Sequence, residues 1–270
     1  MKTLFASLVA CVLTCAIQTA SAEEAPEGDI WPKLRAGLFG TRAIEEANGA
    51  RLEIDLPERA FDAGVVPLGI RWNSLPGDPP LHKLYLVIDK NPSPVGAIFD
   101  FGGAKHAIEF ETRVRIEDYT WVRVIAERKD GSLISTRRFI KASGGCSAPA
   151  GKTLAERMAG IGKIKWRFDE VKEPGGKATV QLLIRHPNIS GLAMDQLTRL
   201  YDPPKFVNQV KVTRGDELVF GAQVDFTISE NPVFRFTLPS EGERELRAEV
   251  TDTDDRLFKS SFEITAPVRD

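Results

Sequence analysis

VRVIAERKDGSLISTRRFIKA, residues 122–142, has the pattern of two β-strands joined by a tight turn. Its first half alternates apolar and charged residues, as a strand with one buried face does, and Ile125 interrupts the polar face. Asp130 and Gly131 supply the turn. LRAEVTDTDDRLFKSSFEITA, residues 246–266, aligns with this segment without a gap, with the apolar positions and the Asp-centred turn in register. This weak repetition supports two β-domains of the same kind.

Short runs rich in β-branched and aromatic residues extend outward from both segments, separated by turn residues. In the first half they are residues 51–56, 65–72, 83–89, 95–101, 106–116, 120–128 and 132–141. In the second half they are residues 164–171, 178–186, 206–215, 217–226, 232–239, 242–252 and 257–266. Seven short strands in about 100 residues are typical of an immunoglobulin-like β-sandwich. The sequence therefore predicts an all-β protein with two such domains.

Helix is scarce in this pattern. A short amphipathic helix is expected to begin after Asp29 and end at Gly40. A second begins at Thr153, where Thr153 and Glu156 form a capping-box pattern. The predicted organisation is a signal peptide (1–22), a sandwich with an N-terminal helix (23–142), a flexible linker (143–153) and a second sandwich (154–270).

The first 22 residues have the features of a secretory signal peptide: a basic start, an apolar run and a small-x-small site at residues 20–22. Cleavage there removes Cys11 and Cys15 and leaves Cys146 in the exported chain, so no internal disulfide is expected. A lipoprotein signal ending at Cys11 is the alternative, with a shorter apolar region. No later stretch reaches the roughly 18 apolar residues of a membrane span. We expect an exported, soluble protein.

Charge composition argues against nucleic-acid binding. The sequence has 36 basic and 38 acidic residues, and removing Lys2 with the signal gives 35 − 38 = −3 before histidine is counted. A nucleic-acid-binding protein normally has a basic excess. The expected exported length, 270 − 22 = 248 residues, is enough for two ordinary domains.

The predicted linker contains the thiol. Gly144 and Gly145 precede Cys146, and Ser147 follows it, in a stretch that gives little to a core. We expect an exposed arm whose thiol has an unperturbed pKa of about 8.5, since charged residues are far along the chain. An exposed free thiol is a liability in an exported protein unless it is used, which suggests a covalent carrier. The alternative is an incidental cysteine in a linker.

Other chemistry has weak support in the sequence. A thiol enzyme needs a base, and the candidates are His82, His106 and His186, each at a strand end or turn. After cleavage of the signal the chain would keep one cysteine, three dispersed histidines and two methionines. These residues share no metal-ligand spacing, so no metal site is expected. An enzyme using one of these histidines is an alternative, but we expect no catalytic site and no cofactor.

Both halves contain motifs that resemble the sulfur-oxidation carrier family SoxYZ. The first half resembles SoxY in Gly144-Gly145-Cys146 after the last strand, and in Asn91-Pro92-x-Pro94 with the strand to Phe99 and Phe101. The motifs resembling SoxZ are Ile184-Arg185-His186-Pro187, Ser190-Gly191-Leu192, Val210-Lys211-Val212 and Ser229-Glu230-Asn231-Pro232. The fused arrangement resembles the branch associated with quinoprotein dehydrogenases.

This resemblance implies a periplasmic carrier that holds a sulfur-containing or other thiol-reactive group on Cys146 for partner enzymes. Gly144, Gly145 and Ser147 would form the flexible arm. A quinoprotein dehydrogenase or a c-type cytochrome is a candidate partner. The alternative is an accessory module of a quinoprotein (PQQ) alcohol dehydrogenase system without covalent cargo.

The sequence departs from the SoxY pattern in two ways. The SoxY arm is a free C-terminus with Gly-Gly after the cysteine, whereas here Ser147 and Ala148 follow and the chain continues. The arm would therefore enter a partner as a loop with two strands of backbone.

Overall fold

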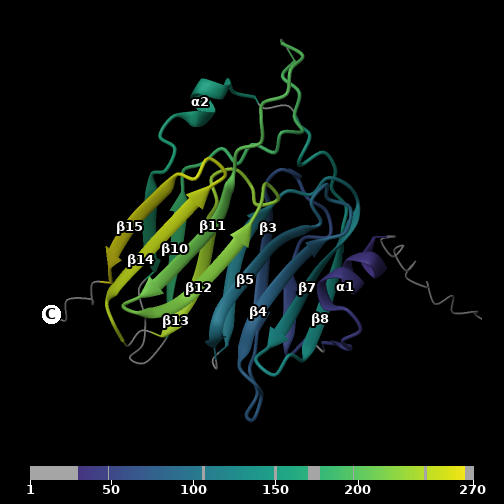
Figure 1. The fold of residues 1–270 in the computed structure, drawn as a ribbon, viewed down its shortest axis with the longest axis vertical. Coiled ribbons are helices and arrows are strands. Elements are labelled where there is room, and N and C mark those ends of the chain that lie inside the picture. Colours follow the sequence, from purple (N-terminus) through teal and green to yellow (C-terminus); the bar gives the residue numbers. More distant parts are fainter. Residues whose placement is uncertain are drawn as a thin grey trace, which may run out of the picture.

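Two facing β-sheets, each continuous through both halves of the chain, form the fold (Figure 1). The computed structural model describes residues 30–47, 49–104, 107–148, 151–169, 177–196, 198–239 and 242–264. The predicted signal peptide and His106 lie outside these residues. In the described part of the chain, neither helix is long and apolar enough to cross a membrane.

The elements follow the predicted order closely. The first half contains α1 (Trp31–Phe39), β1 (Ile44–Glu46), β2 (Leu52–Asp55), β3 (Val66–Trp72), β4 (Leu81–Ile88), β5 (Val95–Ala104), β6 (Ile108–Val114), β7 (Thr120–Arg128) and β8 (Leu133–Ile140). The second half contains α2 (Leu154–Met158), β9 (Ile164–Asp169), β10 (Lys177–Ile184), β11 (Val207–Arg214), β12 (Glu217–Val224), β13 (Val233–Pro239), β14 (Glu245–Asp252) and β15 (Leu257–Glu263). All seven predicted strands of each half are therefore confirmed. The sequence missed β1, which is three residues long and pairs in parallel with β8.

Each half contributes strands to both sheets. Within the described residues, one sheet has the order β1-β8-β7-β4-β5-β12-β11-β14-β15 and the other β2-β3-β6-β13-β10-β9. The halves are thus two β-sandwiches that lie side by side, as Figure 1 shows in blue and in green to yellow. They join where β5 pairs with β12 and β6 pairs with β13, both antiparallel.

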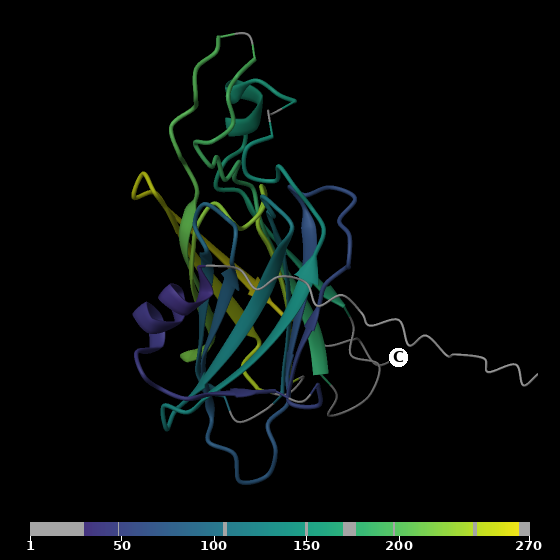
Figure 2. The same ribbon diagram turned by 90° about the vertical axis from the view of Figure 1, so that its right-hand side faces the viewer.

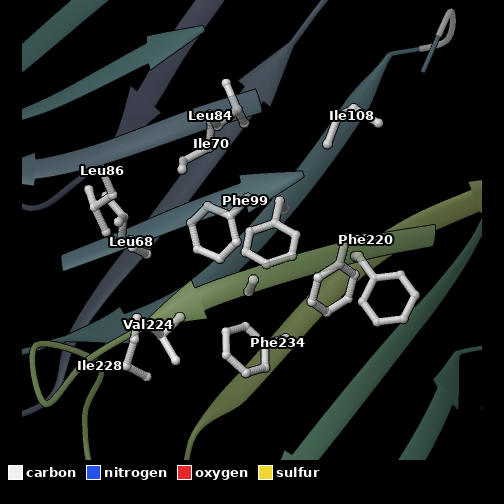
Figure 3. Close-up of a cluster of buried hydrophobic side chains, with 14 of the residues drawn as sticks. Leu68, Ile70, Leu84, Leu86, Phe99, Ile108, Phe220, Val224, Ile228 and Phe234 are labelled. Carbon is white, nitrogen blue, oxygen red and sulfur yellow. The ribbon is translucent and has the colours of Figure 1, made fainter. Parts of the chain in front are cut away.

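One hydrophobic core runs through this junction. Figure 3 shows Phe99 of the first half and Phe220 of the second half in this core. Phe110 of the first half lies 4.7 Å from Phe99 and 5.2 Å from Phe220, measured between ring centroids. All three rings are buried. The prediction of two sandwiches is confirmed, but they share both sheets and a core rather than being connected only by a linker.

Helix α1 explains why Ile125 interrupts the polar face of its strand. It lies against the outer face of the nine-stranded sheet (Figure 2), where Phe39 packs with Ile125 and Leu133. Arg123 on the same face is buried and forms an ion pair with Asp89, with Nη2 and Oδ2 2.8 Å apart. The outer face of this part of the sheet is therefore a second, small core.

Candidate functional site

The segment with Cys146 lies at one end of the joined sandwiches, between β8 and α2. In Figures 1 and 2 this is the upper end, with α2 and residues 185–196 and 198–206. The capping box at the start of α2 is confirmed, because Thr153 and Glu156 bond reciprocally. Arg157 of α2 bonds Asp202, with Nη1 and Oδ2 3.2 Å apart, which ties the helix to residues 198–206.

Both glycines before Cys146 have a defined structural role. Gly144 has φ +79°, which glycine adopts without steric cost. Gly145 is packed so closely that a Cβ there would overlap the Ala63 carbonyl and lie 2.7 Å from the Ile116 oxygen. These glycines allow residues 144–148 to form a turn against the protein, closed by the Ala148 N–H donating to the Gly144 carbonyl at 2.9 Å.

Glu117 holds this turn through its side chain and its backbone. Its carboxylate accepts from the Cys146 N–H at 2.8 Å, from the Ser147 N–H at 3.2 Å and from the Ser147 hydroxyl at 2.5 Å. Its backbone carbonyl accepts from the Gly144 N–H at 2.8 Å. Such a set of bonds to one carboxylate is a clamp on the turn, which we call the Glu117 clamp.

The expectation of an exposed arm at Cys146 is wrong. The residue is a free cysteine with 2% of its surface exposed. The physical reason is the close approach of Gly145 to Ala63 together with the Glu117 clamp, which draw the segment onto the protein. Ser147 and Ala148 are exposed, so only part of the arm faces solvent.

The expected thiol pKa of about 8.5 is also wrong. Burial, and then the negative charge of Glu117, raise the pKa of the Cys146 thiol to about 12. Arg115 opposes this shift and Asp225 adds to it. The thiol is therefore protonated at neutral pH and is a poor nucleophile in this position.

The residues around the Cys146 segment come from both halves of the chain. The Arg115 guanidinium donates to the carbonyls of Phe226 and Ile228, and the second bond is 3.0 Å long. The Ser190 hydroxyl of the second half donates to the Cys146 carbonyl at 2.7 Å. The Cys146 segment therefore bridges the junction between the halves.

Comparison with known families identifies the two halves. The family described as "Sulfur oxidation protein SoxY" matches residues 35–146, and the one described as "Sulphur oxidation protein SoxZ" matches residues 165–263. The chain is a fused SoxYZ-like protein. This confirms the resemblance of each half, and it supports a carrier-type role in sulfur oxidation.

Other comparisons add little to this assignment. No curated protein matches the sequence. A solved structure, a β-glycosidase from Bacteroides vulgatus, is 9% identical with a TM-score of 0.23, and the match covers 79% of this chain. The chain spans 25% of the length of that structure, so this likeness supports no conclusion about function.

Of the two histidines that the structure describes, His82 and His186, neither is among the groups that act on Cys146. Burial lowers the pKa of His186, whose Nε2 lies 3.3 Å from an Asp252 carboxylate oxygen and whose Nδ1 lies 2.8 Å from the Asn188 amide oxygen. Both ring nitrogens of His186 are therefore occupied. His82 lies at the opposite end of β4 from the Cys146 segment.

Three polar residues around the SoxY thiol were missed as site residues by the sequence analysis. They are Glu117, Arg115 and Asp225, which precede or follow strands. Their partners lie far along the chain, since Glu117 bonds Cys146 across 29 positions. Asn91, a residue of the SoxY-like motif, could have pointed to two of them. Its side chain accepts from the Glu117 N–H at 2.9 Å and donates to the Arg115 carbonyl at 2.8 Å.

Exposed apolar side chains gather on the loops at this end of the SoxYZ-like protein. Of the ten large apolar side chains exposed among the described residues, seven lie on the loops next to Cys146 or on α2. They are Phe61, Val65, Tyr119, Leu154, Leu192, Leu200 and Tyr201. Exposed apolar surface of this kind is common where proteins bind partners.

Proposed function

We propose that this protein is an exported, periplasmic carrier that holds a sulfur-containing group on Cys146 while partner enzymes process it. The observation that carries the proposal is the end of the SoxY match at Cys146, directly after Gly144 and Gly145. The position of this cysteine at the end of the matched range supports its assignment as the counterpart of the SoxY carrier thiol. The protein itself supplies attachment and no catalytic site.

Burial of the thiol means that the carrier role needs a local opening. Two of the hydrogen bonds that hold residues 144–148, those from Ser147 to Glu117, lie at the surface of the protein, and Ser147 is exposed. Segments held in this way open at a lower free-energy cost than core strands. The glycines at positions 144 and 145 would act as the hinge of that opening. A partner enzyme would then receive a loop rather than a chain end.

Partner enzymes would dock at the end of the molecule that contains Cys146. The exposed apolar side chains on the surrounding loops support this orientation. A quinoprotein dehydrogenase or a c-type cytochrome is the partner class we propose, by resemblance to the fused branch.

Intact-mass spectrometry of the protein, isolated without reductant from the periplasm of its host, tests the carrier role. The expected result is a mass increase of one or more sulfur atoms or of a sulfonate group, which a thiol reductant removes. A Cys146→Ser variant isolated in the same way should show none. An unmodified mass under conditions in which the host oxidises sulfur compounds would contradict the proposal.

Burial of Cys146 gives specific support to a second candidate function. A thiol with 2% exposure and a raised pKa suits an accessory module of a quinoprotein alcohol dehydrogenase that carries no cargo. The two functions predict different results when a deletion strain is complemented with the Cys146→Ser variant. Full recovery of alcohol oxidation would favour the accessory module, whereas failure to recover a sulfur-dependent phenotype would favour the carrier.

A further inference from the structure

Within the described residues, the hydrogen bonds that hold the Cys146 segment involve groups other than its sulfur. The Glu117 clamp binds two backbone N–H groups and the Ser147 hydroxyl, and Ser190 donates to the Cys146 carbonyl. The closed position therefore needs no particular chemistry at Sγ. What it does require is a side chain that tolerates burial at 2% exposure.

The surroundings of Sγ disfavour negative charge. Two carboxylates, Glu117 and Asp225, act on the sulfur, against one guanidinium, that of Arg115. That guanidinium already donates to two backbone carbonyls of the SoxZ half. Glu230 and Arg157 also act on Arg115, with opposite signs. The closed position thus combines loss of water with the negative charge of Glu117, whose carboxylate also accepts from the Cys146 N–H.

Three shifts in pKa are consistent with this environment. Burial raises the pKa of the Cys146 thiol and of Asp225, and it lowers the pKa of Arg115. In each case the uncharged form is favoured. An anion attached to Cys146 would meet the same cost, because a buried charge without a partner is less stable than one in water.

We propose that the closed position accepts Cys146 only while its side chain is uncharged, so that an anionic group attached to the sulfur releases residues 144–148 and presents the cargo. This inference rests on the carrier role proposed above. The empty thiol stays shielded from oxidation and from unwanted disulfides. A persulfide or a sulfonate on Cys146, both anionic at neutral pH, would open the segment and become accessible to the partner enzymes.

Substitutions that differ only in charge test this inference. Cys146→Asp and Cys146→Asn have side chains of nearly equal size, and only the first is an anion at pH 7. Hydrogen exchange of residues 144–148, followed by mass spectrometry, reports opening of the segment. We expect exchange at least about tenfold faster in Cys146→Asp than in Cys146→Asn, which corresponds to about 1.4 kcal/mol. Equal exchange in the two variants would overturn the inference.

A chemical version of the experiment covers the case in which the Asp variant does not fold. The wild-type thiol is alkylated in urea with iodoacetate or iodoacetamide, and the protein is refolded. The two adducts have similar size, but only the carboxymethyl group is charged. Faster exchange with the carboxymethyl adduct supports the inference. Similar exchange with both adducts means that size or other effects control the segment.

The hydrogen-exchange experiment and the mass-spectrometry test of the carrier role can fail independently. Absence of sulfur on Cys146 in the native protein would contradict the carrier role while leaving the charge response measurable. Equal exchange in the matched pairs would remove the charge response and leave the carrier role standing.

Discussion

At the scale of single residues, Cys146 makes the folded state sensitive to alkaline pH. Its pKa is about 12 in the folded protein and about 8.5 in an unfolded chain. The folded state therefore binds the thiol proton more tightly. This contribution to stability is complete below pH about 8.5 and is lost as the pH rises toward 12.

We predict that wild-type protein loses more stability than Cys146→Ser as the pH rises from 7 to 10. The extra loss should be about 1–2 kcal/mol in the free energy of unfolding, since one unit of pKa corresponds to about 1.4 kcal/mol. Urea unfolding of both proteins at pH 7, 8.5 and 10 measures it, and the serine variant corrects for all other groups. A constant difference across this range would mean that the thiol ionises freely, as in an exposed arm.

Sequence patterns could predict Cys146 as the residue of interest but not its environment. Glycines at 144 and 145 are compatible with two opposite structures, because glycine occurs both in mobile segments and where two backbones approach closely. Only the position of Ala63 against Gly145 decides between them. The clamp by Glu117 depends likewise on how the turn after β6 meets the turn after β8, which local sequence does not encode.

At the scale of elements, the turn of residues 144–148 depends on the absence of a side chain at Gly145. We predict that Gly145→Ala lowers the free energy of unfolding by about 1–3 kcal/mol, because its methyl group would overlap the Ala63 carbonyl. The displaced turn should also make Cys146 react faster with a thiol reagent at neutral pH. Thermal unfolding and the rate of thiol modification measure the two effects.

Gly151→Ala is the matched control for this variant. A Cβ at Gly151 meets no atom within 4 Å, so we expect a change within about 0.5 kcal/mol. If Gly145→Ala behaved like the control in both measurements, the arm would be loose in solution as the sequence first suggested. If both variants were equally destabilised, the cause would be the glycine backbone rather than packing against Ala63.

The strands themselves were predictable because each buries one face. In β6, for example, the observed burial alternates strictly between buried and exposed residues, as the sequence does. What the patterns could not provide was which strands are neighbours. Pairing of β5 with β12 joins residues more than 100 positions apart, and nothing in either strand marks its edge as occupied.

At the scale of the whole molecule, continuity of both sheets predicts that the two halves unfold together. The SoxY and SoxZ halves share the ring cluster of Phe99, Phe110 and Phe220, together with two strand pairs. A defect in one half therefore removes contacts from the other. Two domains connected only by a linker would unfold independently.

Phe220→Ala tests this coupling, since it removes a fully buried ring of the SoxZ half that contacts Phe110 of the SoxY half. Loss of such a ring costs about 3–5 kcal/mol.

Of the four tryptophans, only Trp166 lies in the SoxZ half, so a Trp166→Phe background makes fluorescence report on the SoxY half alone. We predict that Phe220→Ala in this background shifts the fluorescence transition to lower urea by the same amount as the circular dichroism transition of the whole chain. A fluorescence transition that stays in place while the circular dichroism splits into two steps would show that the halves are independent, and that the shared core does not couple them.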